Sequence, residues 1–253
     1  MRTRYLDIED RTDDLHDLMK DRPEQAREFL DKLELSWIYH EAALDGVVLT
    51  GGELQQAFDL TGILEADRSL VFQEVRNFKN AVDVVRNEAK HERRFTMDFA
   101  RNLYEIVNKG IPGRLPLELR KDMPLHRTYF HDIAHPHKIE PGLVELFDHM
   151  NSADFRSEHA IRQAVSVHHT FMVLFPFGDY SGKVARLLMN VIMLRAGYLP
   201  VVIPAVDRQR YYDALRLPHV QFRAFVLDMM QNGLDNAWRF FYPPEERREA
   251  AND

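Results

Sequence analysis

The sequence has 253 residues, enough for one large domain or for one domain with an extension. Its 45% hydrophobic and 29% charged residues are typical of a globular protein, and its net charge of −7 argues against direct nucleic-acid binding, which needs a basic surface. The absence of cysteine excludes disulfides and thiolate metal sites. No apolar run reaches membrane-spanning length and the start of the chain has no apolar segment, so we expect a cytoplasmic protein without membrane contact.

Helical periodicity covers most of the chain, which predicts an all-α fold. Residues 1–22 are expected to be a polar lead-in with a short helix over 10–19. Asp21 and Pro23 predict an N-cap and a first-turn proline for a helix that runs to about Leu44 and ends at Gly46. Its predicted buried face contains Phe29, Leu33, Trp37 and Leu44.

The middle of the chain continues with helices. Thr50 and Glu53 predict a capping box for a short helix over 50–58. Longer helices are expected over 69–91 and 96–107, and the glycine and prolines of 111–117 predict a loop. The later helices are expected over 140–150, 157–173, 182–196, 207–217 and 221–241, before a polar tail.

The segment between two of these helices, 176–182, has the composition of an anion-binding turn. Two glycines, Asp179 and Ser181 precede a helix whose first turns contain Lys183 and Arg186. A helix N-terminus offers unpaired N–H groups and positive potential, and residues three apart lie on one face. A neighbouring aspartate could hold the divalent cation that accompanies phosphate. The same pattern is equally consistent with a capped helix–turn–helix of the core.

The longer stretch around this turn resembles the signature of the Fic (Fido) family, His-Pro-Phe-x-Asp/Glu-Gly-Asn-Gly-Arg-x-x-Arg. It reads FPFGDYSGKVAR over 175–186, with His168 and Phe171 before it and LLMN and GYLP after it. The resemblance implies a helical bundle with a short β-hairpin flap, and transfer of AMP or a related group to a protein hydroxyl. It also implies a helical extension over 1–65, a Fic domain over 66–242 and a tail over 243–253.

Four positions depart from that signature: Phe175, Tyr180, Ser181 and Lys183. Phe175 stands where the family has the histidine that takes the proton from the attacking hydroxyl, and phenylalanine cannot act as a general base. Tyr180 replaces a glycine and is expected to crowd the approach of phosphate to the backbone. No catalytic residue is therefore assigned, and the candidate phosphate- or nucleotide-binding residues are Asp179, Tyr180, Ser181, Gly182, Lys183 and Arg186. Asp179 is also the candidate metal ligand.

A second resemblance lies at the end of the helix over 23–44. The sequence EAALDG at 41–46 is similar to the inhibitory motif that precedes Fic domains, in which a glutamate pairs with the second arginine of the signature. Asp45 stands at the place of that glutamate, so we expect a regulatory Asp45–Arg186 pair. The alternative is that Asp45 is solvated beside a turn.

Histidines gather in the region that corresponds to the flap. His126, His131, His135 and His137 lie within residues 120–140. They could form a metal site or belong to an exposed hairpin, and the absence of cysteine and of a His-x-x-x-His helix favours the hairpin. His168 and His169 are expected to be structural and not replacement bases.

Two functions remain from the sequence. The first is a Fic-fold protein that cannot transfer AMP in the usual way and that binds a nucleotide, another phosphate-bearing ligand or a protein partner. The second is a transferase with altered chemistry, acting on a protein or a small molecule. Mg²⁺ is expected only together with a nucleotide, the partner or target is not identified by the sequence, and a homodimer is left open.

Overall fold

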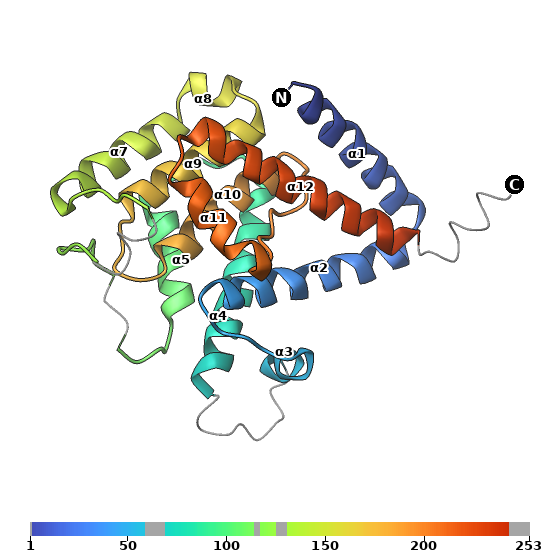
Figure 1. Cartoon of the computed structure of the whole chain (residues 1–253), viewed down its shortest axis with the longest axis horizontal. Coiled ribbons are helices and arrows are strands. Elements are labelled where there is room, and N and C mark those ends of the chain that lie inside the picture. Colours follow the sequence, from blue (N-terminus) through green and yellow to red (C-terminus); the bar gives the residue numbers. More distant parts are fainter. Residues whose placement is uncertain (1, 59–68, 114–116, 125–130, 243–253) are drawn as a thin grey trace, which may run out of the picture.

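The computed structural model describes residues 2–58, 69–113, 117–124 and 131–242 of the chain. Within these ranges the secondary structure is helical and contains no strand (Figure 1). The all-α prediction is therefore confirmed for the described residues. The α-helices are α1 (Arg2–Asp21), α2 (Pro23–Leu44), α3 (Gly51–Phe58), α4 (Ser69–Ala89), α5 (Met97–Asn108), α7 (Ile139–Met150), α8 (Ala153–Ser157), α9 (Ala160–Leu174), α10 (Ser181–Arg195), α11 (Arg208–Leu215) and α12 (His219–Phe241), with 3₁₀ turns η2 (Pro136–Lys138) and η3 (Ala205–Asp207).

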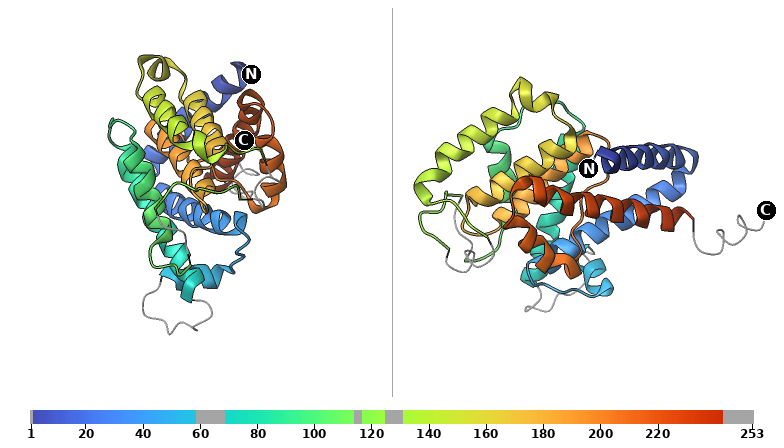
Figure 2. Two further views of the ribbon diagram at one scale, coloured as in Figure 1. Left: turned by 90° about the vertical axis from the view of Figure 1, so that its left-hand side faces the viewer. Right: turned by 45° about the horizontal axis from the view of Figure 1, so that its top comes forward.

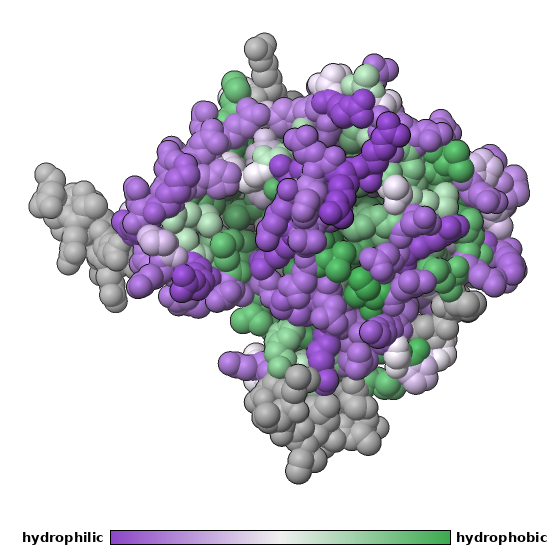
Figure 3. Space-filling model, turned by 180° about the vertical axis from the view of Figure 1, so that it is seen from behind, coloured by the Kyte–Doolittle hydropathy of each residue, from purple (hydrophilic) through white to green (hydrophobic). Residues whose placement is uncertain are grey.

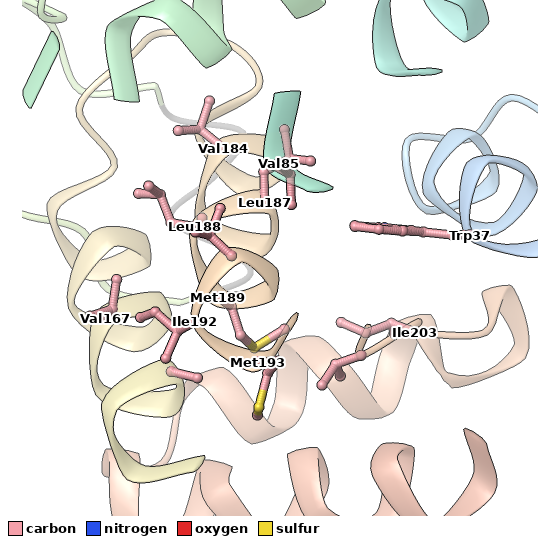
Figure 4. Close-up of a cluster of buried hydrophobic side chains, with 14 of the residues drawn as sticks. Trp37, Val85, Val167, Val184, Leu187, Leu188, Met189, Ile192, Met193 and Ile203 are labelled. Atoms are coloured by element: carbon pink, nitrogen blue, oxygen red, sulfur yellow. The ribbon is translucent and has the colours of Figure 1, made fainter. Parts of the chain in front are cut away.

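Helix α10 lies at the centre of the bundle. It packs against α9, α4 and α5, and every residue from Lys183 to Met193 is buried. A helix that is buried on all sides belongs in a core. The apolar side chains of α10 point toward those of the surrounding helices, and Trp37 of α2 points toward α10 from the side (Figure 4). The start of α10 carries the predicted binding residues, so the most buried helix of the bundle positions the motif.

Helix α1 is longer than the short helix predicted over 10–19. It runs parallel to α12 at one edge of the bundle, and the two are in contact (Figure 2). Ile8 and Leu15 are buried, and ion pairs join Arg4 to Asp228 at 2.5 Å and Arg11 to Asp235 at 2.7 Å. The prediction was wrong because the segment is mostly polar, and its helix is stabilised by packing and by charges 224 residues away.

The ends of the early helices agree with most of the predicted capping. The Thr50 N–H donates to Glu53 at 2.8 Å and the Glu53 N–H donates to Thr50 Oγ at 3.2 Å, which confirms the capping box. Gly46 has a φ of +90°, the conformation for which glycine is suited after a helix. Pro23 begins α2 as predicted, but the N-cap is Arg22 and not Asp21.

The region predicted as a β-hairpin flap shows no strand in its described parts, 117–124 and 131–135; residues 125–130, including His126, lie outside the described residues. The face of the molecule that lies behind the view of Figure 1 is largely hydrophilic, with smaller hydrophobic areas between the polar residues (Figure 3). No described helix is long and apolar enough to cross a membrane.

Candidate functional site

The loop from Phe175 to Tyr180, called here the motif loop, joins α9 to α10. It begins and ends with a left-handed backbone: φ is 41° at Phe175 and 54° at Tyr180. This conformation costs a residue with a Cβ about 1–2 kcal/mol. Phe175 is 1% exposed and Tyr180 is 7% exposed, so burial of their rings stabilises both strained positions. A glycine-like backbone is thus retained at Tyr180 although the residue is not glycine.

Ser181 closes the motif loop on itself. Its hydroxyl donates to the carbonyl of Phe177 and accepts from the N–H of the same residue, both at 2.9 Å. Ser181 is fully buried, so its hydroxyl holds the loop and does not face solvent. Gly182 is packed closely, since a Cβ at its position would lie 3.0 Å from Arg186 Nη1.

Lys183 and Arg186, the basic pair, face the C-terminal end of α2 and are each 4% exposed. Arg186 Nε donates to Glu41 Oε1 at 2.9 Å and to Oε2 at 3.0 Å, and its Nη2 also donates to Oε1. Lys183 Nζ lies 3.0 Å from Asp45 Oδ2 and 3.9 Å from the centroid of the Tyr180 ring. Two carboxylates of α2 therefore neutralise the two cations that were predicted to bind an anion.

The carboxylate that forms the ion pair with Arg186 is Glu41, and the predicted Asp45–Arg186 pair was assigned to the wrong acid. Glu41 lies in the last turn of α2 and Asp45 is the C-cap that directly follows the helix, so the two carboxylates lie one turn apart, as do the members of the basic pair on α10. The longer glutamate meets the deeper arginine, and Asp45 pairs with Lys183. The sequence does contain a feature that could have predicted Glu41 as the partner of Arg186: two acidic residues spaced by four match two basic residues spaced by three.

Behind the basic pair lies a buried polar chain. Arg186 Nη1 donates to the Tyr211 hydroxyl at 3.3 Å, and His168 Nε2 lies 3.0 Å from the same oxygen. The pKa of His168 lies well below its ordinary value. Burial is the main cause, and the nearby charge of Arg186 lowers the pKa further. Burial alone would lower the pKa of Arg186, but the charge of Glu41 raises it well above the ordinary value, so the guanidinium stays charged. His168 is fully buried behind Arg186, a structural position as predicted.

Comparison with known proteins agrees with this architecture. Residues 94–193 match the model of the Fic/DOC family. The protein adenylyltransferase Fic of Drosophila grimshawi is 26% identical over 225 residues, which cover 78% of this chain and 41% of that protein. Its counterpart in Nematostella vectensis is 29% identical over 197 residues, covering 75% and 44%. The chain thus spans less than half the length of these curated relatives.

Solved structures share the fold. A Fic domain containing signaling protein from Bacteroides thetaiotaomicron superposes with a TM-score of 0.77 at 21% identity, covering 91% of this chain and 97% of that one. Fic-1 from C. elegans superposes with a TM-score of 0.73 at 19% identity, covering 92% and 71%. The chain therefore has the fold of Fic proteins, and its residues 94–193 are similar to the Fic/DOC family. The family match lies inside the Fic domain predicted over 66–242, whose boundaries stay a prediction.

In this Fic fold, the C-terminal end of α9 is held by Arg120, which the sequence analysis did not single out. Its side chain donates to the carbonyls of Phe175 at 2.7 Å, Leu174 at 3.2 Å and Asp122 at 3.0 Å, and also to that of Ala134. An arginine at a helix C-terminus satisfies carbonyls that have no partner within the helix. A single arginine thus ties both described parts of the flap region to the motif loop at Phe175.

The flap histidines show no metal site in the described residues. His131 is buried, with Nε2 2.9 Å from the Met172 carbonyl, and the rings of His135 and His137 stack with centroids 5.9 Å apart. No group of three His, Asp or Glu side chains that could hold a metal occurs in the parts of the chain that are described. Asp179 alone fits Mg²⁺ only if a nucleotide supplies phosphate oxygens, because that ion prefers few protein ligands and retains water.

Proposed function

We propose that this chain is a Fic-fold protein that does not transfer AMP by the route of its relatives and that binds a phosphate-bearing ligand, such as a nucleotide, at the basic pair. The observation that carries the proposal is Phe175. It occupies the position of the family base, is 1% exposed, and packs edge-on to His131 with ring centroids 6.2 Å apart. A side chain without a titratable group cannot take a proton from an attacking hydroxyl.

The state of the basic pair supports ligand binding as a regulated event. Lys183 and Arg186 are charges kept in the interior, and each has a carboxylate from α2 against it. An unpaired buried charge is costly, so an anion could replace a carboxylate only if α2 moved at its C-terminal end. The retained cations therefore favour a closed phosphate site over a site that has been lost.

A transferase with altered chemistry is the second candidate. It is favoured by four residues of the motif. Asp179, Gly182 and Arg186 match the family signature, and Lys183 keeps the positive charge of the arginine that it replaces. In this candidate the base would have to come from a group other than Phe175. A protein partner at the same site in place of a small ligand is an alternative form of the first candidate.

Calorimetric titration with ATP, with and without magnesium, tests the proposal. Asp45→Asn should raise the affinity for ATP, because Asp45 is 20% exposed at its side chain and its loss frees Lys183 without opening the core. Lys183→Met in that background should abolish the gain. Glu28→Gln is the matched control, since it removes an acidic partner of Lys32 on the exposed side of α2.

The products of the same incubations separate the candidates. Mass spectrometry of the protein and of a protein mixture should detect no AMP adduct. An adduct formed by the unaltered sequence would overturn the proposal in favour of the transferase. Equal ATP binding, or none, in all variants would show that the basic pair is not a ligand site.

A further inference from the structure

A second cavity, of about 360 Å³, lies at the far end of α10 from the motif loop. It is formed where the segment before α5, the helix α8, the start of α9 and the end of α10 meet. Because α10 has 15 residues, the cavity and the motif loop are separated by roughly 20 Å, from the helical rise per residue. It is therefore not part of the site described above.

The lining of this cavity is basic although the whole chain is acidic. Four arginines line it, and Glu92 is the acidic residue of its lining. Glu88, just outside, lies 3.8 Å from Arg93 and 3.6 Å from Arg195, too far for hydrogen bonds. Four guanidinium groups against two carboxylates leave a local excess of two positive charges. The arginines are Arg93, Arg94, Arg156 and Arg195.

Arg195 is held above an aromatic ring and has donor capacity left. Its guanidinium lies 4.5 Å from the centroid of Phe95. Its two terminal nitrogens donate to backbone carbonyls at 3.3 and 3.4 Å, the long end of the range for hydrogen bonds. Its Nε is buried and has no hydrogen-bond partner among the described residues. A guanidinium placed in this way is suited to an anion.

The floor of the cavity is apolar. Phe95, Met150, Phe155 and Ile192 line it and are all buried. The arginines Arg94 and Arg156 are exposed at the opening, and Arg94 forms no ion pair with any residue in the described part of the chain. An apolar floor below a basic rim matches a ligand with a flat apolar body and one anionic group.

We propose that this cavity binds a small aromatic anion, in which a ring packs on the apolar floor and a phosphate or carboxylate group pairs with Arg94, Arg156 and Arg195. The volume is within the range of small-molecule sites, and at its lower end, which favours a ligand of one or two rings. The site is separate from the basic pair, and its occupancy does not depend on the function proposed above.

Isothermal titration with phenyl phosphate tests this on the full chain. We expect saturable binding that weakens with salt, as charge pairing at an open rim requires. Phenol and inorganic phosphate should each bind at least about tenfold more weakly than phenyl phosphate, because each lacks one half of the ligand. Benzoate and phenyl phosphate, compared directly, distinguish a carboxylate site from a phosphate site.

The double variant Arg94→Gln/Arg156→Gln should weaken phenyl phosphate binding by at least about tenfold, since it removes two charged donors. The double variant Arg216→Gln/Arg239→Gln changes the net charge equally at two exposed arginines elsewhere and should bind as the unaltered chain does. If both double variants lost phenyl phosphate binding equally, the overall charge of the chain would explain the loss and the proposal would be overturned.

Two other results would also overturn it. One is loss of phenyl phosphate binding in Lys183→Met, which would place the ligand at the basic pair. The other is no binding of phenyl phosphate by the unaltered chain.

Discussion

Glu41 of α2 and Arg186 of α10 lie 145 residues apart in the sequence and form an ion pair whose side chains are 3% and 4% exposed. The guanidinium donates from Nε and Nη2 to the same carboxylate, and from Nη1 to Tyr211. This contact joins the end of the N-terminal helices to the central helix of the Fic domain. The pair holds the end of α2 against α10, and in the proposed function an anion would have to displace it to reach Arg186.

Removal of one member of this pair should destabilise the protein strongly. Glu41→Gln leaves the Arg186 charge buried without its counter-ion, a change that costs about 3–5 kcal/mol. Urea unfolding followed by circular dichroism measures the loss. Glu28→Gln removes the same charge from the exposed Glu28–Lys32 pair and should cost less than about 1 kcal/mol. Equal losses in the two variants would show that the buried pair is not important for the fold.

Tyr180 gives a prediction about backbone strain. Tyr180→Gly and Tyr180→Ala remove the same ring, but only glycine adopts a φ of 54° without cost. The glycine variant should therefore be more stable than the alanine variant by about 1 kcal/mol. At Tyr212, inside α11, the order should be reversed by about the same amount, because glycine is the poorer helix former. The four unfolding midpoints decide the matter; the same order at both positions would exclude strain at Tyr180.

Arg120 should control the order of the flap region. Arg120→Gln removes most of the bonds to the carbonyls of Phe175, Leu174 and Ala134, and hydrogen bonds from a charged donor contribute about 1.5–3 kcal/mol each. Hydrogen exchange should accelerate at the Ala134 N–H, which donates to Val173 at 2.8 Å. Lys121→Gln, at an exposed neighbour, should leave that exchange rate unchanged. Unchanged exchange in Arg120→Gln would mean that other contacts hold the flap.

The sequence was sufficient for features that depend on neighbouring residues. The capping box of Thr50 and Glu53, the turn at Gly46 and the core position of Trp37 follow from local spacing, and the structure confirms them. The length of α1 and the partner of Arg186 depend on α12 and α2, which are distant in the sequence, and both predictions were wrong. Arg120 gave no signal, because the carbonyls of Phe175 and Leu174 that it binds are more than 50 residues away in the sequence.

His168 predicts a loss of stability in mild acid. Burial is the main cause that holds the pKa of this ring well below its ordinary value, and the Arg186 charge adds to it. The unfolded chain therefore binds a proton near pH 6.5 that the folded chain does not, and stability falls as the pH drops below that value, by up to about 1.4 kcal/mol per pH unit. Above pH 7 this contribution vanishes, since the ring is neutral in both the folded and the unfolded chain.

His168→Gln tests this. It should lower the stability at neutral pH, because the bond to Tyr211 and the stacking on Phe222 change. It should also make the stability depend less steeply on pH between pH 6.5 and 5. His219→Gln, on the exposed start of α12, controls for the substitution itself. Urea unfolding at half-unit steps of pH gives the slopes, and an unaltered slope in His168→Gln would assign the acid sensitivity to other groups.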